Sequence, residues 1–118
     1  GDQIGCPTYA QDIARSIVEI IPQLNSREYN GIYHYCGDQP CSWFDFAKEI
    51  FDQLKMYDQI FTPTIKAVTT EEYPTLAKRP KFSVLDNKKI QENFDIFSSD
   101  WKVGVESSLK RLVKDSCI

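Results

Sequence analysis

The stretch GIYHYCGDQPCSWFDFAKEIFDQLK, residues 31–55, sets the expected fold of this chain. Its first part, residues 32–36, is short, aromatic and β-branched and lies between two glycines, which predicts a β-strand. These residues do not alternate between apolar and polar, so we expect a strand covered on both faces, as in a parallel sheet. His34 stands in the middle of this strand, and we expect it to be a packed or edge-exposed strand residue without a catalytic role.

The second part of the stretch predicts a helix that begins at Ser42 and ends near Lys55. Serine is a favoured N-cap residue, and Asp45 follows at the third helical position. The apolar side chains recur at helical spacing and form the expected buried stripe: Phe46, Ala47, Ile50, Phe51 and Leu54.

A helix is also expected before this stretch, over residues 8–23. Thr8 and Gln11 have the spacing of a capping box, and the apolar residues that follow recur mostly at helical intervals. Pro22 is compatible only with the final turn of such a helix, which sets its expected end.

The second half of the chain predicts one more strand and two more helices. Residues 64–68 are β-rich but follow Pro63, which indicates a short strand at a sheet edge. Residues 71–82 contain two prolines and should be irregular. Helices are expected over 87–93, with Asp86 as a cap, and over 99–114, whose buried side should be Trp101, Val105, Leu109, Leu112 and Val113.

This order of helices and strands predicts an α/β fold that is rich in helix and has two or three short strands. The chain of 118 residues is about 0.8 of an average domain, so it forms one domain or a piece of one. A strand covered on both faces needs neighbours, and the pattern resembles the end of a larger sheet. Because the sequence begins at Gly1 without an initiator Met, we expect a chain that was processed or cut.

Composition excludes several classes of protein. The chain carries 14 Lys and Arg against 17 Asp and Glu, a net charge of −3, and has no extended basic block for nucleic acid. With 42% hydrophobic and 26% charged residues, it has ordinary globular composition. No apolar run approaches the roughly 20 residues of a membrane span, and the polar start is unlike a signal peptide. We expect no nucleic-acid partner and no membrane partner.

The four cysteines predict free thiols. No two of them have the C-x-x-C spacing, and the single His34 does not complete a zinc set. The four are Cys6, Cys36, Cys41 and Cys117. Unpaired cysteines are typical of a reducing compartment, and we expect the cytoplasm.

Two segments stand out chemically. Residues 2–10 form a dense loop that runs into a helix start, where backbone N–H groups face outward; a tightly packed cap is the alternative. Residues 73–83 hold Lys78, Arg79 and Lys81 between stiffening prolines, and the planar guanidinium of Arg79 suits a phosphate. An ordinary charged surface loop is the alternative for this second segment.

Five blocks in this order resemble the C-terminal portion of the dTDP-4-dehydrorhamnose reductases, a family of extended short-chain dehydrogenase/reductases. The resemblance covers essentially all of residues 1–118. The blocks are DQIGCPTYAQDIA, GIYHYCG, CSWFDFAKEIF, EEYPTLAKRPKFSVLD and DWKVGVESSL.

The resemblance implies reduction of the 4-keto group of dTDP-4-dehydro-L-rhamnose by NADPH or NADH in the full-length enzyme. The family's Gly-rich cofactor loop and Tyr-x-x-x-Lys pair belong to an N-terminal Rossmann portion, and this sequence contains neither. We therefore expect residues 1–118 to be a substrate-binding portion that is inactive alone and binds no nicotinamide cofactor. Its implied partners are the dTDP-sugar and that Rossmann portion, and the resemblance leaves a homodimer open.

The resemblance also implies the ligand contacts. An Arg-Pro segment late in related chains supplies an arginine to the nucleotide pyrophosphate, which carries over to Arg79, with Lys78 as a weaker second. Trp43 is a candidate for stacking on the ligand, with packing of the helix start as the alternative. Some members hold a metal through acidic side chains, but the facing position here is Arg111, so we expect none. A reductase or epimerase for another nucleotide-sugar, or a stand-alone binding module, stays open.

Overall fold

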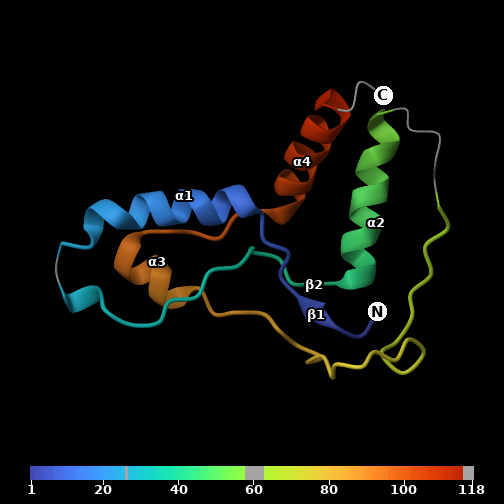
Figure 1. Ribbon diagram of the computed structural model, residues 1–118, viewed down its shortest axis with the longest axis horizontal. Coiled ribbons are helices and arrows are strands. Elements are labelled where there is room, and N and C mark those ends of the chain that lie inside the picture. The colour runs from blue at the N-terminus through green and yellow to red at the C-terminus, as the bar shows by residue number, and fades with distance from the viewer. Residues whose placement is uncertain (26, 58–62, 116–118) are drawn as a thin grey trace.

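The computed structural model of the chain describes residues 1–25, 27–57 and 63–115. Figure 1 shows two helical lobes, α1 with α3 and α2 with α4, joined by extended segments and by a small sheet. The elements are β1 (Ile4–Gly5), α1 (Ala10–Ile20), β2 (Cys41–Ser42), α2 (Trp43–Leu54), α3 (Lys88–Phe94) and α4 (Trp101–Asp115), with 3-10 helices at Ile21–Gln23, Arg27–Tyr29 and Lys55–Tyr57.

Each lobe has its own small hydrophobic core. In the first lobe, Phe94 of α3 contacts the rings of Tyr29 and Tyr33, each with a centroid distance of 5.1 Å. In the second lobe, Trp101 of α4 lies edge-to-face with Phe46 of α2 at 5.5 Å. The two cores are separate, and the lobes are joined by polar contacts and by the Tyr9 side chain, which lies against Gly104 of α4.

Helix α2 begins and ends where its sequence predicts, but the expected buried stripe is only half-buried, and Gln53 is the buried residue of the helix. The half-buried residues are Phe46, Ala47, Ile50, Phe51 and Leu54. The Ser42 hydroxyl accepts a hydrogen bond from the backbone N–H of Asp45 at 3.0 Å, and the Asp45 carboxylate accepts one from the backbone N–H of Ser42 at 3.2 Å. This reciprocal capping satisfies two backbone donors at the helix start. The expected end near Lys55 is confirmed, since Lys55 is the C-cap residue.

Helix α1 is shorter than the expected 8–23, because its last part is a 3-10 turn at Ile21–Gln23. The expected capping box of Thr8 and Gln11 is wrong. The Thr8 hydroxyl donates to the carbonyl of Cys6 at 3.1 Å and accepts from the backbone N–H of Gly37 at 3.2 Å. A tertiary contact therefore uses the side chain that local spacing assigned to the helix start.

Both expected strands are wrong. Residues 32–36 and 64–68 are extended but pair with no strand within the described parts of the chain. The sheet instead pairs β1 with β2 in antiparallel order, with Ile4 opposite Ser42. Strands of two residues are too short to show an alternating pattern in the sequence. Their pairing is decided by the segments that folding brings beside them.

Asn87 takes the place of a neighbouring strand for the extended segment 32–36. Its side-chain oxygen accepts from the backbone N–H of Cys36 at 2.9 Å, and its amide nitrogen donates to the carbonyl of Cys36 at 2.9 Å. The same nitrogen donates to the Ser98 hydroxyl at 2.7 Å. One side chain thus connects the start of α3 with Ser98, 11 residues later, and with Cys36, 51 residues earlier.

Further polar contacts surround this junction. The backbone N–H of Asp38 donates to the carbonyl of Ser99 at 3.2 Å, and the Ser99 hydroxyl donates to the carboxylate of Asp12 on α1. A side chain at Gly37 would collide with the carbonyl oxygen of Pro7, so glycine permits this close approach of two backbones.

The two C-terminal helices lie where the sequence predicts, but two of the residues expected on the buried side of α4 are not buried, Val113 being half-buried and Leu112 exposed. The carboxylate of Asp86 accepts from the backbone N–H of Lys88 at the start of α3, at 2.8 Å. Trp101, Val105 and Leu109 of α4 are buried. The expectation that Leu112 is buried is wrong: its side chain is 62% exposed, because it lines an open cavity between α4, α2 and the start of α1.

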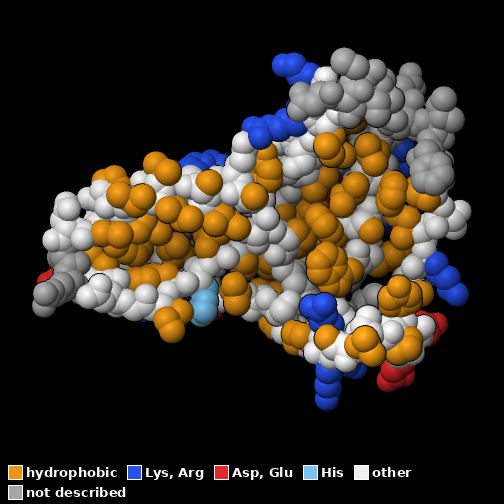
Figure 2. Space-filling view, viewed as in Figure 1, with side chains coloured by type: hydrophobic (Ala, Val, Ile, Leu, Met, Phe, Trp, Pro, Cys, Tyr) orange, Lys and Arg blue, Asp and Glu red, His pale blue; other side chains and the backbone are white. Residues whose placement is uncertain are grey.

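Helix α1 is packed with its polar side inward. Asp12 and Ser16 are buried, while an apolar strip of α1 and the turn after it is exposed. The strip consists of Ile13, Ile17, Val18, Ile21 and Leu24, and Figure 2 shows apolar side chains gathered over this lobe. An apolar surface of this kind is typical of a face that packs against another protein surface.

Removal of the Asn87 side chain should destabilise the fold strongly. Asn87→Ala leaves the buried backbone of Cys36 without partners, and we expect a loss of about 2–4 kcal/mol in the free energy of unfolding. Urea denaturation followed by circular dichroism measures it. Asn93→Ala is the matched control, because exposed Asn93 makes one long contact of 3.4 Å to Tyr33 and should cost less than about 0.5 kcal/mol. Equal losses for the two variants would contradict the role of Asn87.

The exposed strip on α1 should cause self-association. Sedimentation velocity at increasing concentration should show dimers or larger species, and Ile17→Lys should shift them to monomer with an unchanged helix signal. Gln11→Lys adds the same charge on an exposed polar position of the same helix and should leave association unchanged. A wild-type chain that stays monomeric at high concentration would show that the strip is not adhesive.

Candidate functional site

A cavity of about 720 Å³ lies between the N-terminal segment, the segment 68–83 and the start of α2. These are the two segments that stand out in the sequence, together with Trp43. The lining residues come from all three parts: Gly1, Asp2, Gln3, Ile4, Trp43, Val68, Thr69, Thr70, Tyr73, Thr75, Arg79, Pro80 and Ser83.

Backbone hydrogen bonds of Ile4 bring the two segments together. The N–H of Ile4 donates to the carbonyl of Lys81 at 2.8 Å, and the carbonyl of Ile4 accepts from the N–H of Ser83 at 2.9 Å. On its other side, Ile4 pairs with Ser42 of β2, which precedes Trp43 directly. One residue of β1 therefore positions both the irregular segment 68–83 and the first residue of α2.

Two aromatic rings of the cavity wall are open to solvent. Trp43 is 69% exposed and Tyr73 is 70% exposed, although both residues are large and partly apolar. The indole of Trp43 is supported on one side by Phe46, at a centroid distance of 6.2 Å. Exposed rings of this kind offer faces on which a planar ligand group can stack.

Arg79 supplies the positive charge of the cavity. It forms no ion pair with a carboxylate in the described parts of the chain, so its guanidinium keeps its donors for a ligand. Lys78 is exposed in the same segment but does not line the cavity. Of the three residues expected to contact the ligand, the structure brings Arg79 and Trp43 together and leaves Lys78 at the side.

Sequence reasoning missed a polar wall formed by Asp2, Gln3 and Thr70. The Asp2 carboxylate accepts from the hydroxyl of Thr70 at 2.8 Å and from its backbone N–H at 2.9 Å. These hydrogen bonds, led by that from the hydroxyl, lower the pKa of Asp2 below its ordinary value. The Gln3 amide nitrogen donates to the Thr70 hydroxyl at 3.1 Å. The only sequence signal for this wall was the loop expected at residues 2–10.

Cys6 and Cys41 line a second, smaller cavity of about 330 Å³ beside β1 and β2. Both are free thiols, as is Cys36, and Cys117 lies outside the described residues. Burial raises the pKa of Cys6 to about 11 and raises that of Cys41 as well. Thiols held in the protonated form are poor nucleophiles, so this second cavity lacks an activated cysteine.

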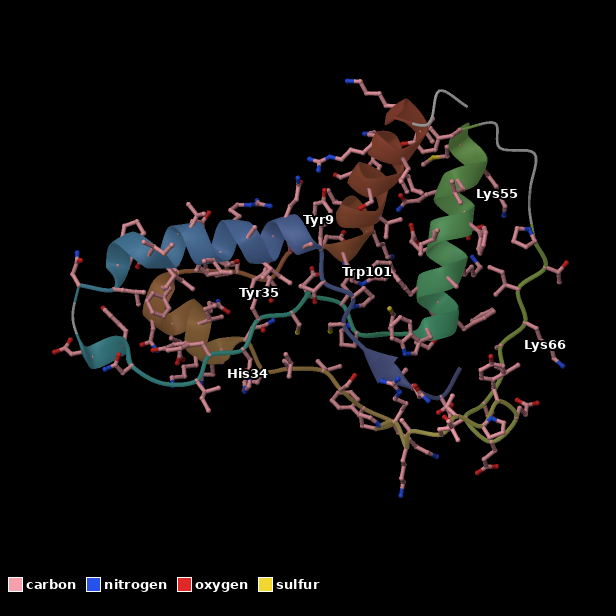
Figure 3. The ribbon with its side chains drawn as sticks, in the orientation of Figure 1. Tyr9, His34, Tyr35, Lys55, Lys66 and Trp101 are labelled. Carbon is pink, nitrogen blue, oxygen red and sulfur yellow. The ribbon has the colours of Figure 1, made fainter. Side chains whose placement is uncertain are left out.

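Other titratable groups give no catalytic arrangement. His34 is exposed on the extended segment at the outer edge of the molecule (Figure 3). The Tyr35 hydroxyl contacts the Ser99 hydroxyl at 3.3 Å and belongs to the junction between the lobes. Within residues 1–25, 27–57 and 63–115, no group of three His, Cys, Asp or Glu side chains could hold a metal ion. Over the same residues, every helix is too short or too polar to cross a membrane.

Comparison with known proteins identifies the family. Residues 1–114 match the family model described as "RmlD substrate binding domain", and the chain therefore belongs to that family. A dTDP-4-dehydrorhamnose reductase of Aggregatibacter actinomycetemcomitans is 46% identical over 106 residues, which are 86% of this chain and 35% of the relative.

Two solved structures share the fold. A dTDP-4-dehydrorhamnose reductase from Clostridium acetobutylicum superposes with a TM-score of 0.80 and 34% identity, covering 94% of this chain and 36% of that one. The Bacillus anthracis reductase, solved in complex with NADP, gives a TM-score of 0.79 and 32% identity over 93% of this chain and 36% of that one. The chain thus spans about a third of the length of these relatives.

The Cys6 thiol should react slowly with alkylating reagents. A pKa raised from 9.0 to about 11 lowers the thiolate fraction about 100-fold, and the greater nucleophilicity of a more basic thiolate recovers about tenfold of this. We expect iodoacetamide to modify Cys6 about tenfold more slowly in the folded chain than in urea at the same pH, as followed by mass spectrometry. Equal rates would show that burial does not protect the thiol.

Proposed function

We propose that this chain is the substrate-binding portion of a dTDP-4-dehydrorhamnose reductase, which reduces dTDP-4-dehydro-L-rhamnose to dTDP-L-rhamnose with NADPH or NADH. The observation that carries the proposal is the meeting of Arg79 and Trp43 on one cavity of about 720 Å³. The membership of the substrate-binding family and the reductase relatives support the same assignment. A cavity of this volume is within the usual range for small-molecule sites.

Charge explains why the ligand would contact Arg79. A dTDP pyrophosphate is anionic and the chain carries a net charge of −3, so binding needs a local cation. The guanidinium of Arg79 can donate two parallel hydrogen bonds to phosphate oxygens, and Lys78 would add a weaker, more distant charge. Pro74 and Pro80 limit the freedom of the segment that holds Arg79, so less conformational entropy is lost on binding.

The chain's own residues would bind and orient the substrate and leave the chemical step to another portion of the enzyme. No tyrosine of the sequence is followed four residues later by a lysine, so the proton donor of the reaction is not in this chain. The hydride would come from a nicotinamide cofactor held by a Rossmann portion. In this arrangement residues 1–118 fix the dTDP group, which places the 4-keto group of the sugar at the cofactor.

The exposed apolar strip of α1 would pack against that Rossmann portion. The strip is continuous along the helix, and the relatives contain about two-thirds of their length outside the region similar to this chain. Burial of these side chains would stabilise the chain by about 25 cal/mol for each Å² of apolar area removed from water.

Replacement of Arg79 should weaken binding of dTDP. Loss of a charge-assisted contact to the pyrophosphate should lower the affinity of this chain for dTDP about ten- to a hundredfold in Arg79→Ala, as measured by calorimetry. Arg79→Lys should recover only part of the loss, because Lys lacks the planar fork. In the complete reductase, Arg79→Ala should raise the Michaelis constant for the dTDP-sugar by a similar factor and lower the turnover number less.

Lys78→Ala provides the matched control, since Lys78 is a neighbouring cation outside the cavity wall. We expect it to change dTDP affinity by less than about threefold. A larger effect for Lys78→Ala than for Arg79→Ala would show that the wrong cation was chosen. Absence of dTDP binding by the wild-type chain would contradict the proposed function itself.

A further inference from the structure

The hydrogen bonds of the polar wall fix the orientation of the Gln3 amide. The ionised Asp2 carboxylate has no proton, so in its 2.8 Å contact with the Thr70 hydroxyl the hydroxyl must be the donor. The Thr70 oxygen can then only accept in its 3.1 Å contact with Gln3. The hydrogen-bond network therefore requires that the amide nitrogen of Gln3, and not its oxygen, faces Thr70.

This orientation leaves a defined pair of groups on Gln3. The side-chain oxygen has no donor in the described parts of the chain, and the amide nitrogen keeps its second N–H. Both belong to a residue that lines the cavity with Trp43, Tyr73 and Arg79. An acceptor next to a donor in one plane complements a ligand edge with an N–H next to a carbonyl.

We propose that Gln3, oriented by Thr70 and Asp2, recognises the N3–H and carbonyl edge of thymine or uracil in this cavity and discriminates against cytosine. The inference rests on the proposed function and names the part of the nucleotide that the polar wall reads. Gln3 is a specificity-determining residue in this assignment, and Thr70 and Asp2 are positioning residues.

The rest of the cavity fits this placement of the base. Trp43 and Tyr73 offer exposed ring faces on which the base can stack, and Arg79 binds the diphosphate. The nucleotide is therefore held at its base and at its diphosphate. A cytosine in the same position would place its unprotonated N3 against the Gln3 oxygen and its amino group against the Gln3 N–H. One acceptor would then face another acceptor and one donor would face another donor, so neither contact could form a hydrogen bond.

A turned amide would accept cytosine, so the hydroxyl of Thr70 is essential to the discrimination. Without it, the nitrogen and oxygen of Gln3 could exchange places at little cost. Thr70→Val keeps the shape of the side chain and removes the hydroxyl, whereas Thr70→Ser keeps the hydroxyl and is the rescue control.

Calorimetric titration of the 118-residue chain with dTDP, dUDP and dCDP tests the proposal. We expect dTDP and dUDP to bind about tenfold to a hundredfold more tightly than dCDP, as for other well-aligned paired contacts to a base edge. The ratio of dUDP to dCDP affinity should fall below about threefold in Gln3→Ala and Thr70→Val and be retained in Thr70→Ser. Arg79→Ala should weaken all three nucleotides and leave the ratio unchanged.

The outcomes separate this inference from the proposed function. Equal binding of dUDP and dCDP by the wild-type chain, or an unchanged ratio in Gln3→Ala, would overturn base recognition by Gln3 while dTDP binding stands. Binding of none of the three nucleotides would overturn both. Circular dichroism of each variant checks folding, and Gln3→Ala, which alters a partly exposed side chain, decides the question if Thr70→Val does not fold.

Discussion

The contacts of the Asn87 side chain hold the two lobes of this chain in place. Segment 32–36 has the composition of a buried strand, yet its backbone has no strand beside it in the described residues. Asn87 satisfies both backbone groups of Cys36 and reaches Ser98 as well. The two hydrophobic cores do not merge, so these polar contacts, those of Ser99 and the packing of Tyr9 against Gly104 connect the lobes. A small domain with a divided core depends heavily on such bonds.

A second constraint, the pairing of Ile4 on both sides, creates the candidate site. The same residue bonds to segment 81–83 and pairs with β2, so a cation, a stacking ring and a polar wall meet although they are distant in sequence. The cavity also has a division of chemistry that suits a nucleotide. Arg79 provides charge, Trp43 and Tyr73 provide flat apolar faces, and the Gln3 amide provides a directional edge.

The comparison of Ser42 with Thr8 shows why some local predictions succeed. Both begin a sequence with capping-box spacing, but Ser42 makes the box with Asp45 and Thr8 does not make one with Gln11. The Thr8 hydroxyl is used by the backbone of Gly37, which no local pattern can reveal. For the same reason Arg79 could be proposed from its residue type and neighbours, whereas Gln3 and Thr70 could not, because the roles proposed for them depend on a hydrogen bond across 67 residues.

The sequence by itself determined the positions of α2, α3 and α4, because capping and helical periodicity act over a few residues. It also carried the family resemblance and the choice of Arg79 and Trp43 as ligand contacts, which stays a prediction. Only the tertiary structure decided that α1 buries Asp12 and exposes Ile17, since the choice of buried face depends on what lies next to the helix. It also decided the strand pairing and the orientation of Gln3, because both follow from contacts between segments that the chain brings together only on folding.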